Sequence, residues 1–521
     1  MKSSEIPVLI VGAGPTGLVL ALWLARLGVR VRIIDKTAEP GTTSRALAVQ
    51  VRTLEFYQQI GLADEVVKRG RQVTTVNFWA GGEKRGDSVA FGGLGTGLTP
   101  FPYALIFPQD EHERLLIDRL ADEGIRVERE TELLSLQESA NDVVANLKRA
   151  DGSQETLRVA YVAGCDGARS KVREELGIGF PGGSYAHLFY VADVEARGAA
   201  VDGHLHVALD TAAFLIVFPL KQDGRIRLVG TIRKVPETEN EKLGWDDVSK
   251  QVIEWMRLDV SRIHWFSTYH VHHRVANQFR QGRAFLLGDA AHIHSPVGGQ
   301  GMNTGIGDAV NLAWKLAAAL EGRAKEAILD SFEPERIAFA RQLVSTTDRA
   351  FTFITSSGPI AQLVRHNVAP FVIPALFGIN AFRRFMFRTV SQTAITYRKS
   401  PIGLGRAGRV HGGDRLPWIV NAAGGNDNFS SLTSLEWQVH VYGAPSRDLV
   451  SACLDRELAL HVFPWRADME QAGLLRNALY LVRPDGHVAL ADADASASEL
   501  TAYLDRWKIR TAAGAEHHKA A

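Results

Sequence analysis

Apolar residues near the start of the chain alternate between short continuous runs and runs at helical spacing. Val8 to Val11 form a continuous run, the turn GAGPTG follows at 12–17, and apolar residues recur at helical spacing from Leu18 to Leu27. Val29 to Ile34 form a second continuous run, which ends at Asp35. Because short apolar runs are typical of buried strands, the pattern predicts strand, helix and strand.

Two later strands are predicted to end in similar turns. Tyr161 to Ala163 lead into Gly164-Cys165-Asp166-Gly167, and Ala284 to Leu287 lead into Gly288-Asp289. A further helix begins in the glycine-rich run 298–301. A helix start exposes unpaired N–H groups, and glycines let an anion or an electron-rich ring approach them closely. The alternatives are a loop at 298–301 that only turns the chain, and a helix cap made by Asp166.

The pattern changes to alternation of apolar and polar positions between Leu188 and Thr231. Alternation is typical of half-buried strands, so we expect an inserted antiparallel sheet that closes one side of a pocket. Apolar helices interrupted by prolines follow at 348–398. We expect them to belong to the packed core, with a cover for the pocket or a homodimer contact as alternatives. From Trp437 onward, strands, helices and a hairpin predict a small α/β unit.

Composition and charge exclude several classes of protein. The chain has 521 residues, 46% of them apolar, and a formal net charge of +1 with both signs interspersed, so no nucleic-acid surface is predicted. Cys165 and Cys453 form no CxxC pattern, and the histidines, including His292 and His294, lack carboxylates at metal-ligand spacing. We therefore predict no disulfide and no metal site. Without a signal peptide or a bilayer-spanning run, a cytoplasmic protein with no stable membrane insertion is expected.

The first turn has the spacing of a dinucleotide-binding turn. Gly12, Gly14 and Gly17 give the pattern GxGxxG between a predicted strand and helix, and Asp35 stands at the end of the next strand. Glycines permit the tight turn and the close approach of a pyrophosphate, and the acid accepts a hydrogen bond from a ribose hydroxyl. A plain tight turn is the alternative. Since only one GxGxxG is present, a second dinucleotide is expected to dock transiently.

Three motifs in this order resemble one known family. They are GAGPTG with Asp35, CDGARS at 165–170, and GDAAHIHSPVGGQGMNTGIGDAVNLAWK at 288–315. Together they resemble the single-component flavin-dependent aromatic hydroxylases, which include para-hydroxybenzoate and phenol hydroxylases, over residues 6 to 345. The tail, with LVRPDGHVA at 481–489, looks like the thioredoxin-like unit of the larger members, although it lacks CxxC.

The resemblance implies an α/β fold with a Rossmann-like FAD-binding domain and an inserted, mostly antiparallel substrate sheet. The predicted FAD-binding domain comprises 1–77, 100–182 and 275–345, the sheet domain 78–99 and 183–274, the helical segment 346–400 and the thioredoxin-like domain 401–521. Because every flavin motif precedes Gly405, we expect FAD binding to survive removal of the chain after that residue.

The resemblance also assigns the residues that contact tightly bound FAD. Asp166 is implied to touch the pyrophosphate side and the passing NAD(P)H, and Asp289 the ribityl chain. For Arg45 the alternative is a solvated surface position. The full implied set is Gly12, Gly14, Thr16, Gly17, Asp35, Arg45, Gln109, Asp166, Asp289, Gly298, Gly299, Gln300, Gly301, Met302 and Asn303.

The implied chemistry is hydroxylation of a phenolic or other electron-rich aromatic substrate. NADPH or NADH reduces the flavin, O2 adds at C4a, and the hydroperoxyflavin delivers oxygen to the ring. A group near the substrate hydroxyl would assist, and Pro296, Tyr190 and His206 are the candidates, with Phe218 and Pro296 as substrate contacts. Packing or a surface position is the alternative for each. A flavin-carrying sensor without turnover is the alternative function.

Overall fold

A mostly parallel sheet at the centre of the molecule carries the three glycine-rich turns. The computed structural model describes residues 6–41, 46–90, 93–209, 214–232, 243–295, 298–355, 376, 379–420 and 427–511. The central sheet has the order β17-β18-β11-β1-β2. Its strands are β1 (Val8–Val11), β2 (Val31–Ile34), β11 (Tyr161–Gly164), β17 (Arg280–Gln281) and β18 (Ala284–Leu286). Because β1, β2, β11 and β18 run parallel, the turns that follow β1, β11 and β18 meet at one edge of the sheet.

Helices and two small sheets surround this central sheet. α1 (Pro15–Arg26) and α7 (Gly301–Leu320) pack against one another and bury an apolar face that includes Leu18, Trp23 and Trp314. The remaining helices here are α2 (Val51–Gln59), α3 (Ala63–Arg69), α4 (Gln109–Asp122), α5 (Lys171–Glu175), α8 (Phe332–Thr355) and α11 (Asn380–Val390). The small sheets are β3 (Ala48–Val49), β7 (Ala104–Ile106) and β4 (Arg71–Val73), and β8 (Glu132–Glu138), β9 (Val143–Lys148) and β10 (Gln154–Val159).

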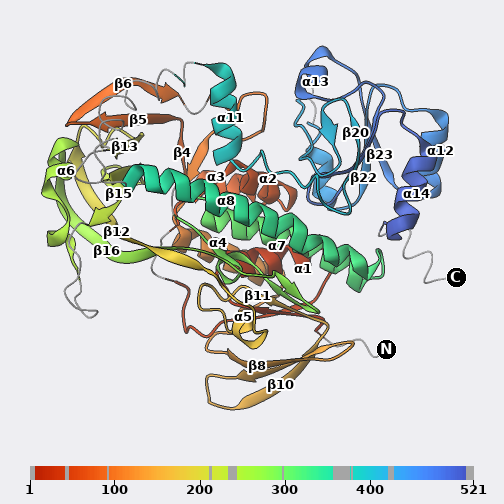
Figure 1. Cartoon of the computed structure of the whole chain (residues 1–521), viewed down its shortest axis with the longest axis horizontal. Coiled ribbons are helices and arrows are strands. Elements are labelled where there is room, and N and C mark those ends of the chain that lie inside the picture. Colours follow the sequence, from red (N-terminus) through yellow and green to blue (C-terminus); the bar gives the residue numbers. More distant parts are fainter. Residues whose placement is uncertain are drawn as a thin grey trace.

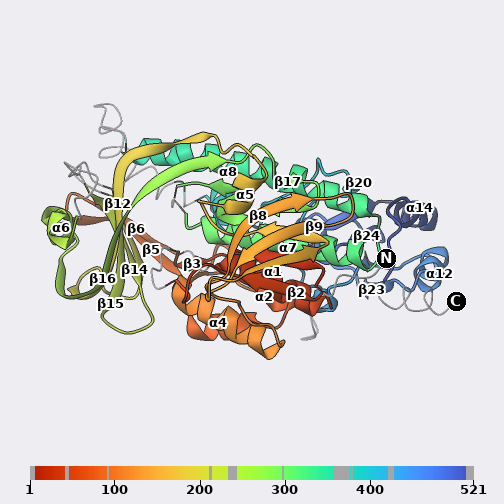
Figure 2. The same cartoon turned by 90° about the horizontal axis from the view of Figure 1, so that it is seen from below.

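A large, mainly antiparallel sheet lies beside the nucleotide-binding part, as the alternating pattern predicts (Figure 1). Its order is β19-β16-β12-β15-β14-β13-β5-β6. The strands are β5 (Thr75–Ala80), β6 (Glu83–Ala90), β12 (Gly182–Gly198), β13 (Leu205–Leu209), β14 (Phe214–Pro219), β15 (Arg225–Ile232), β16 (Leu258–Val275) and β19 (His292–Ile293). The boundary predicted between 77 and 78 falls inside β5. Figure 2 shows the sheet between α6 (Lys250–Trp255) on one side and the nucleotide-binding part on the other.

The C-terminal unit contains a sheet of order β21-β20-β25-β24-β22-β23. Its strands are β20 (Leu404–Ala407), β21 (Val410–His411), β22 (Gln438–Tyr442), β23 (Ala459–Phe463), β24 (Leu479–Val482) and β25 (Val488–Asp492), and its helices are α12 (Arg447–Asp455), α13 (Ala467–Ala472) and α14 (Ala497–Trp507). The strands and helices predicted from Trp437 onward are all present. None of the helices in the described ranges has the length and apolar character needed to cross a bilayer.

Candidate active site

The turn after β1 is built from glycines because no side chain fits at two of its positions. Gly12 has φ +102°, and a Cβ atom there would lie 2.3 Å from the carbonyl oxygen of Cys165. A Cβ atom at Gly17 would lie 2.0 Å from the carbonyl oxygen of Gly12. A Cβ atom at Gly14, by contrast, would meet no other atom within 4 Å. The backbone before α1 is thus tightly packed on its inner side and open at Gly14, as the approach of a pyrophosphate requires.

Asp35 lies at the end of β2, next to this turn. Its Oδ2 accepts a hydrogen bond from the backbone N–H of Ala13 at 2.7 Å. Its Oδ1 accepts from the backbone N–H and the hydroxyl of Thr37 at 2.9 and 2.7 Å. The carboxylate therefore holds the glycine turn in place as well as standing at the position predicted for a ribose contact.

Asp166 lies in the turn after β11, where one of its oxygens caps α5. Oδ2 accepts from the backbone N–H groups of Lys171 and Val172 at 2.7 and 3.1 Å. Ser170, and not Asp166, is the N-cap residue, because its hydroxyl accepts from the N–H of Arg173. Within the described residues, Oδ1 of Asp166 is buried and has no hydrogen-bond partner. Burial raises the pKa of this carboxyl group. An orphaned polar atom beside the glycine turn fits a ligand with hydroxyl or amide donors.

Asp289 is exposed at the tip of a short 3-10 turn, Gly288–Ala290. The turn is fixed from below by Asp308 of α7, whose Oδ2 accepts from the N–H of Gly288 at 2.9 Å and contacts Nε2 of His292 at 2.8 Å. Arg336 of α8 donates to Oδ1 of Asp308 at 2.6 Å. Burial alone would raise the pKa of Asp308, but Arg336 and His292 hold it below its usual range.

The carboxylate of Asp308 and the guanidinium of Arg336 were missed by the sequence reasoning. Asp308 stands in the motif GIGDAVN, and the signal that could have identified it is a carboxylate within the apolar face of a predicted helix. Arg336 is also fully committed, because it donates to Tyr397 at 2.7 Å and to the carbonyl oxygen of Thr304 at 3.0 Å. These contacts fix the backbone that presents Asp289.

Thr16 packs between the two elements that meet at this turn. A Cβ atom at Gly305 of α7 would lie 2.3 Å from its hydroxyl oxygen, and one at Gly288 would lie 2.7 Å from it. Gly288 also has φ +59°, in the left-handed region that favours glycine. Glycine at both positions therefore lets the start of α1 approach the turn that carries Asp289.

The start of α7 lies at the same edge of the central sheet. Gly298 and Gly299 have φ values of +83° and +62°, and the first intrahelical bond runs from the N–H of Thr304 to the carbonyl oxygen of Gln300 at 2.9 Å. The N–H groups of Gly301 and Met302 therefore precede the helical ladder, as the glycine pattern predicts. A helix of this length presents a partial positive charge there.

Asn303 locks this glycine loop to α2. Its Oδ1 accepts from the N–H of Gln50 and the hydroxyl of Thr53, both at 2.8 Å. Its Nδ2 donates to the carbonyl oxygens of Ala48 and Gly299 at 2.8 and 2.9 Å. The Asn303 side chain thus positions the glycine loop, whereas the sequence predicted a role for the backbone of this residue alone.

Gln109 is the first residue of α4, where the sequence places it. Its Oε1 accepts from the N–H of Ala46 at 3.2 Å, and its Nε2 donates to Glu113 at 2.8 Å. Gln300 donates to the carbonyl oxygen of Val390 at 2.8 Å. The predicted positions Arg45 and Pro296 lie outside the described residues.

The two faces of the large sheet carry different sets of the predicted residues. Phe218 lies on the face toward the nucleotide-binding part, where it packs with Ile106 and Leu220. Tyr190 lies on the opposite face and packs with Val252 of α6. His206 lies on that face too.

His206 accepts a hydrogen bond from Trp79 at 2.9 Å and contacts Asp202 at 2.7 Å. Both side chains thus lie on the sheet face away from the nucleotide-binding part, which favours the packing alternative for Tyr190 and His206. An alternating strand gives two sets of side chains, and both sets are buried here, so the sequence pattern did not reveal which set faces the flavin.

Comparison with known proteins identifies the family. The model of the FAD binding domain family matches residues 5–347. A curated relative is the 6-methylpretetramide 4-monooxygenase of Streptomyces rimosus, which is 34% identical over 95% of this chain and 92% of the relative. This chain belongs to the FAD-binding monooxygenases.

Solved structures agree with this assignment. The anhydrotetracycline hydroxylase of Streptomyces rimosus has a TM-score of 0.76 and 28% identity, covering 96% of this chain and 98% of its own. The ternary complex of aklavinone-11 hydroxylase with FAD and aklavinone has a TM-score of 0.74 and 25% identity, covering 97% and 99%. This monooxygenase is an FAD-dependent aromatic hydroxylase with the α/β fold of its family, and the alternative of a flavin-carrying sensor is set aside.

Proposed function

We propose that the enzyme uses NADPH or NADH and O2 to hydroxylate a phenolic substrate with several fused rings. The observation that carries the substrate class is a row of aromatic side chains on the flavin-facing side of the large sheet. Phe189 packs against Phe214 and Tyr269 with ring centroids 6.5 and 5.9 Å apart. Phe214 and Phe218 share this face because they are four residues apart on β14.

The apolar row extends along the sheet and suits a substrate longer than one ring. Val271 packs against Phe189 at one end, and Phe218 packs against Ile106 and Leu220 at the other. Flat aromatic surfaces of this kind bind planar rings by stacking and by removing apolar area from water. The substrates named for the relatives above, 6-methylpretetramide, anhydrotetracycline and aklavinone, support the same class.

The residues of the glycine-rich turns are proposed to hold FAD in one orientation. Gly12, Gly14 and Gly17 take the pyrophosphate, and Asp35 takes the ribose. The buried free oxygen of Asp166 faces the pyrophosphate side, Asp289 accepts from the ribityl chain, and Arg45 and Gln109 complete the set. The start of α7 faces the ring system.

Bound FAD would take up two electrons from NADPH or NADH and use them to activate O2. The chain's own contribution is orientation, a positive potential and exclusion of water. The N–H groups at the start of α7 stabilise negative charge on the ring edge that they face. The aromatic row on the sheet excludes water from the side where the substrate lies. With Tyr190 and His206 on the far face, we assign no side chain as a general base.

We further propose the domain division predicted above, with β5 kept whole in the sheet domain and a thioredoxin-like C-terminal unit at 401–521. The order β22-α12-β23 followed by β24, β25 and α14 supports it. β22 pairs with β23 in parallel, and β24 pairs antiparallel with β22 and with β25. No CxxC is present, so this unit is proposed to be structural. A homodimer stays a prediction.

Oxygen-isotope labelling tests the proposed function. Purified protein is incubated with FAD, NADPH or NADH, and a panel of single-ring and fused-ring phenols under 18O2. We expect substrate-dependent NAD(P)H oxidation and a product heavier by one 18O atom, with fused-ring phenols giving the highest kcat/KM. Faster turnover of single-ring phenols would overturn the substrate class, and peroxide without labelled product from every phenol would overturn phenol hydroxylation.

A further inference from the structure

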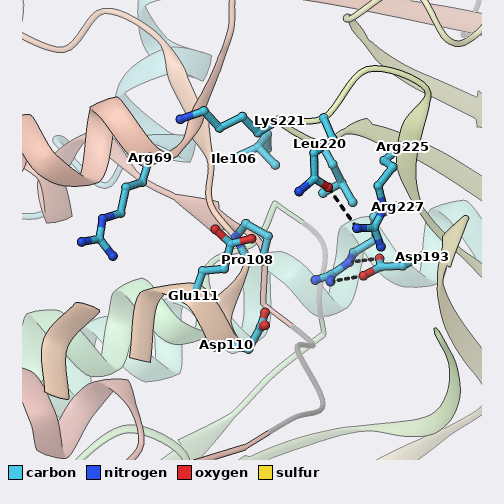
Figure 3. Close-up of a pocket in the computed structure, with 11 residues that line it drawn as sticks. Arg69, Ile106, Pro108, Asp110, Glu111, Asp193, Leu220, Lys221, Arg225 and Arg227 are labelled. Atoms are coloured by element: carbon cyan, nitrogen blue, oxygen red, sulfur yellow. Dashed lines mark hydrogen bonds and ion pairs between the residues drawn. The ribbon is translucent and has the colours of Figure 1, made fainter. Parts of the chain in front are cut away.

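A polar cavity of about 350 Å³ lies between the large sheet and the nucleotide-binding part (Figure 3). It is lined from α3 and α4 on one side and from β12 and the β14–β15 turn on the other. Its size is that of a small-molecule site. None of the residues assigned above to FAD lines it, so its side chains are available for another ligand.

Cations dominate the sheet side of the cavity. Arg227 is committed to Asp193, with its Nη2 2.7 Å from Oδ2, so this pair is neutral. Arg225 donates to Gln222 at 3.0 Å, while its Nε is buried and has no hydrogen-bond partner among the described residues. Lys221 extends from the adjoining turn and donates to the carbonyl oxygen of Lys68. Arg225 and Lys221 therefore have no carboxylate partner among the residues that line the sheet side.

The opposite side combines carboxylates with an apolar floor. Asp110 and Glu111 belong to the first turn of α4, and Asp110 lies 3.3 Å from Arg114. Arg69 of α3 also lines the cavity, as Figure 3 shows, and its guanidinium pairs with Glu65. The apolar part of the lining comes from Ile106, Pro108 and Leu220.

The lining matches a dinucleotide better than it matches an aromatic substrate. Phosphate oxygens pair with guanidinium and ammonium groups, ribose hydroxyls donate to carboxylates, and a planar base packs on apolar side chains. A fused-ring phenol would cover the guanidinium of Arg225, whose Nε is buried, without supplying a hydrogen-bond partner, at a cost. The chain's single GxGxxG turn is assigned to FAD, so NAD(P)H needs a different surface.

The cavity also adjoins the flavin site. Pro108 directly precedes Gln109, and Ile106 pairs with Ala48 of β3, whose carbonyl oxygen accepts from Asn303. We propose that this cavity docks NAD(P)H, with Arg225 and Lys221 on the phosphates, Asp110 and Glu111 on ribose hydroxyls, and the apolar floor under a base. This inference rests on the proposed use of NAD(P)H.

The test measures nucleotide binding separately from turnover. FAD-loaded protein is first reduced with dithionite without oxygen, so that NADPH or NADH binds without reacting, and is then titrated by nucleotide fluorescence. Arg225→Ala should raise the Kd about tenfold, as expected for a lost charge-assisted hydrogen bond, and Arg225→Lys should recover most of the affinity. The wild-type Kd should also rise with salt more steeply than that of Arg225→Ala. Arg262→Ala, at an exposed arginine of β16, is the matched control and should bind as the wild type does.

The outcomes separate this inference from the proposed function. A wild-type protein that binds neither nucleotide, and whose oxidised flavin neither nucleotide reduces, would refute both. A wild-type protein that binds NADPH or NADH, with an unchanged Kd in Arg225→Ala, would overturn the docking site and leave the proposed function standing. An unchanged nucleotide Kd together with a raised KM for the aromatic substrate would assign the cavity to that substrate instead.

Discussion

Arg483 in the C-terminal hairpin and Glu335 of α8 form an ion pair with both side chains buried. Nη1 of Arg483 lies 2.8 Å from Oε1 of Glu335, and the two side chains are 1% and 0% exposed. Lys315 of α7 contacts the other oxygen of Glu335 at 2.8 Å. Burial alone would raise the pKa of Glu335, but Arg483 and Lys315 hold it at about 2. The C-terminal unit thus supplies a counter-charge that the nucleotide-binding part requires.

Arg483→Met should lower the free energy of unfolding by about 3–5 kcal/mol, because it leaves Glu335 buried with one cation fewer. Urea unfolding of the FAD-loaded protein measures the loss. The matched control is Arg456→Met, which removes an ion pair to Asp505 whose side chains are 36% and 58% exposed, and which should cost about 0–1 kcal/mol. Equal losses in the two variants would contradict the importance of the buried pair.

Helix α2 joins the C-terminal unit to the glycine loop before α7. Arg52 donates to the carbonyl oxygen of Asp485 at 2.7 Å, and Gln59 donates to that of Pro484 at 3.0 Å. Gln50 and Thr53, which flank Arg52 at the start of the same helix, bond to Asn303. The C-terminal hairpin and the loop that faces the flavin therefore hold the same helix.

Deleting the chain after Gly405 should consequently abolish stable FAD binding. The deletion leaves Glu335 without Arg483, and it removes Arg415, which pairs with the buried Glu55. The structure thus argues against the expectation that the flavin motifs alone suffice. Soluble yield and FAD content of the truncated protein measure the effect, with deletion after Thr511 as the control. A folded, FAD-loaded truncated protein would restore the modular interpretation.

Local patterns predicted the elements well, since each depends on neighbouring residues. β1 (Val8–Val11) matches the predicted run, and α1 begins at Pro15, three residues before the predicted helical spacing starts at Leu18. The strands, helices and hairpin predicted after Trp437 are also present. Contacts between distant residues were not predictable in this way. Asp308 meets Arg336 and Glu335 meets Arg483 across 28 and 148 positions, and no spacing rule links them.

Tyr190→Phe should leave kcat and kcat/KM within about twofold of the wild-type values, because Tyr190 lies on the sheet face away from the flavin side. Among the described residues its hydroxyl group is buried without a hydrogen-bond partner, so its removal should not lower the free energy of unfolding. Steady-state kinetics and urea unfolding check both statements. A drop in kcat of a hundredfold or more would place Tyr190 at the reacting atoms after all.

Acidification should destabilise the protein through its buried histidines. Burial lowers the pKa of His440 on β22 from 6.5 to about 3, so between these values the unfolded chain binds a proton that the folded chain excludes. The free energy of unfolding therefore falls as the pH falls below about 6.5, by up to about 1.4 kcal/mol per pH unit for this residue. His440→Gln should lose that part of the slope.

Urea unfolding between about pH 7.5 and pH 5 measures the slope. His294 and His487 also have their pKa values lowered to about 4 by burial, so part of the slope remains in the His440 variant. A His440 variant with an unchanged slope would show that the imidazole takes up a proton in the folded state.

Asp289→Ala should weaken FAD binding while leaving the fold intact. The exposed carboxylate is removed, but the N–H of Gly288 still donates to Asp308, so the turn keeps its shape. We expect a loss of ~1–3 kcal/mol in FAD affinity from the missing acceptor, and turnover that recovers when excess FAD is supplied.

Asp308→Asn is the informative contrast to Asp289→Ala. It removes the charge paired with Arg336, and it should lower the free energy of unfolding at every FAD concentration. Bound FAD and product formation are measured together on both variants. Full flavin occupancy with no product in Asp289→Ala would place this carboxylate at the reacting atoms and not at the ribityl chain.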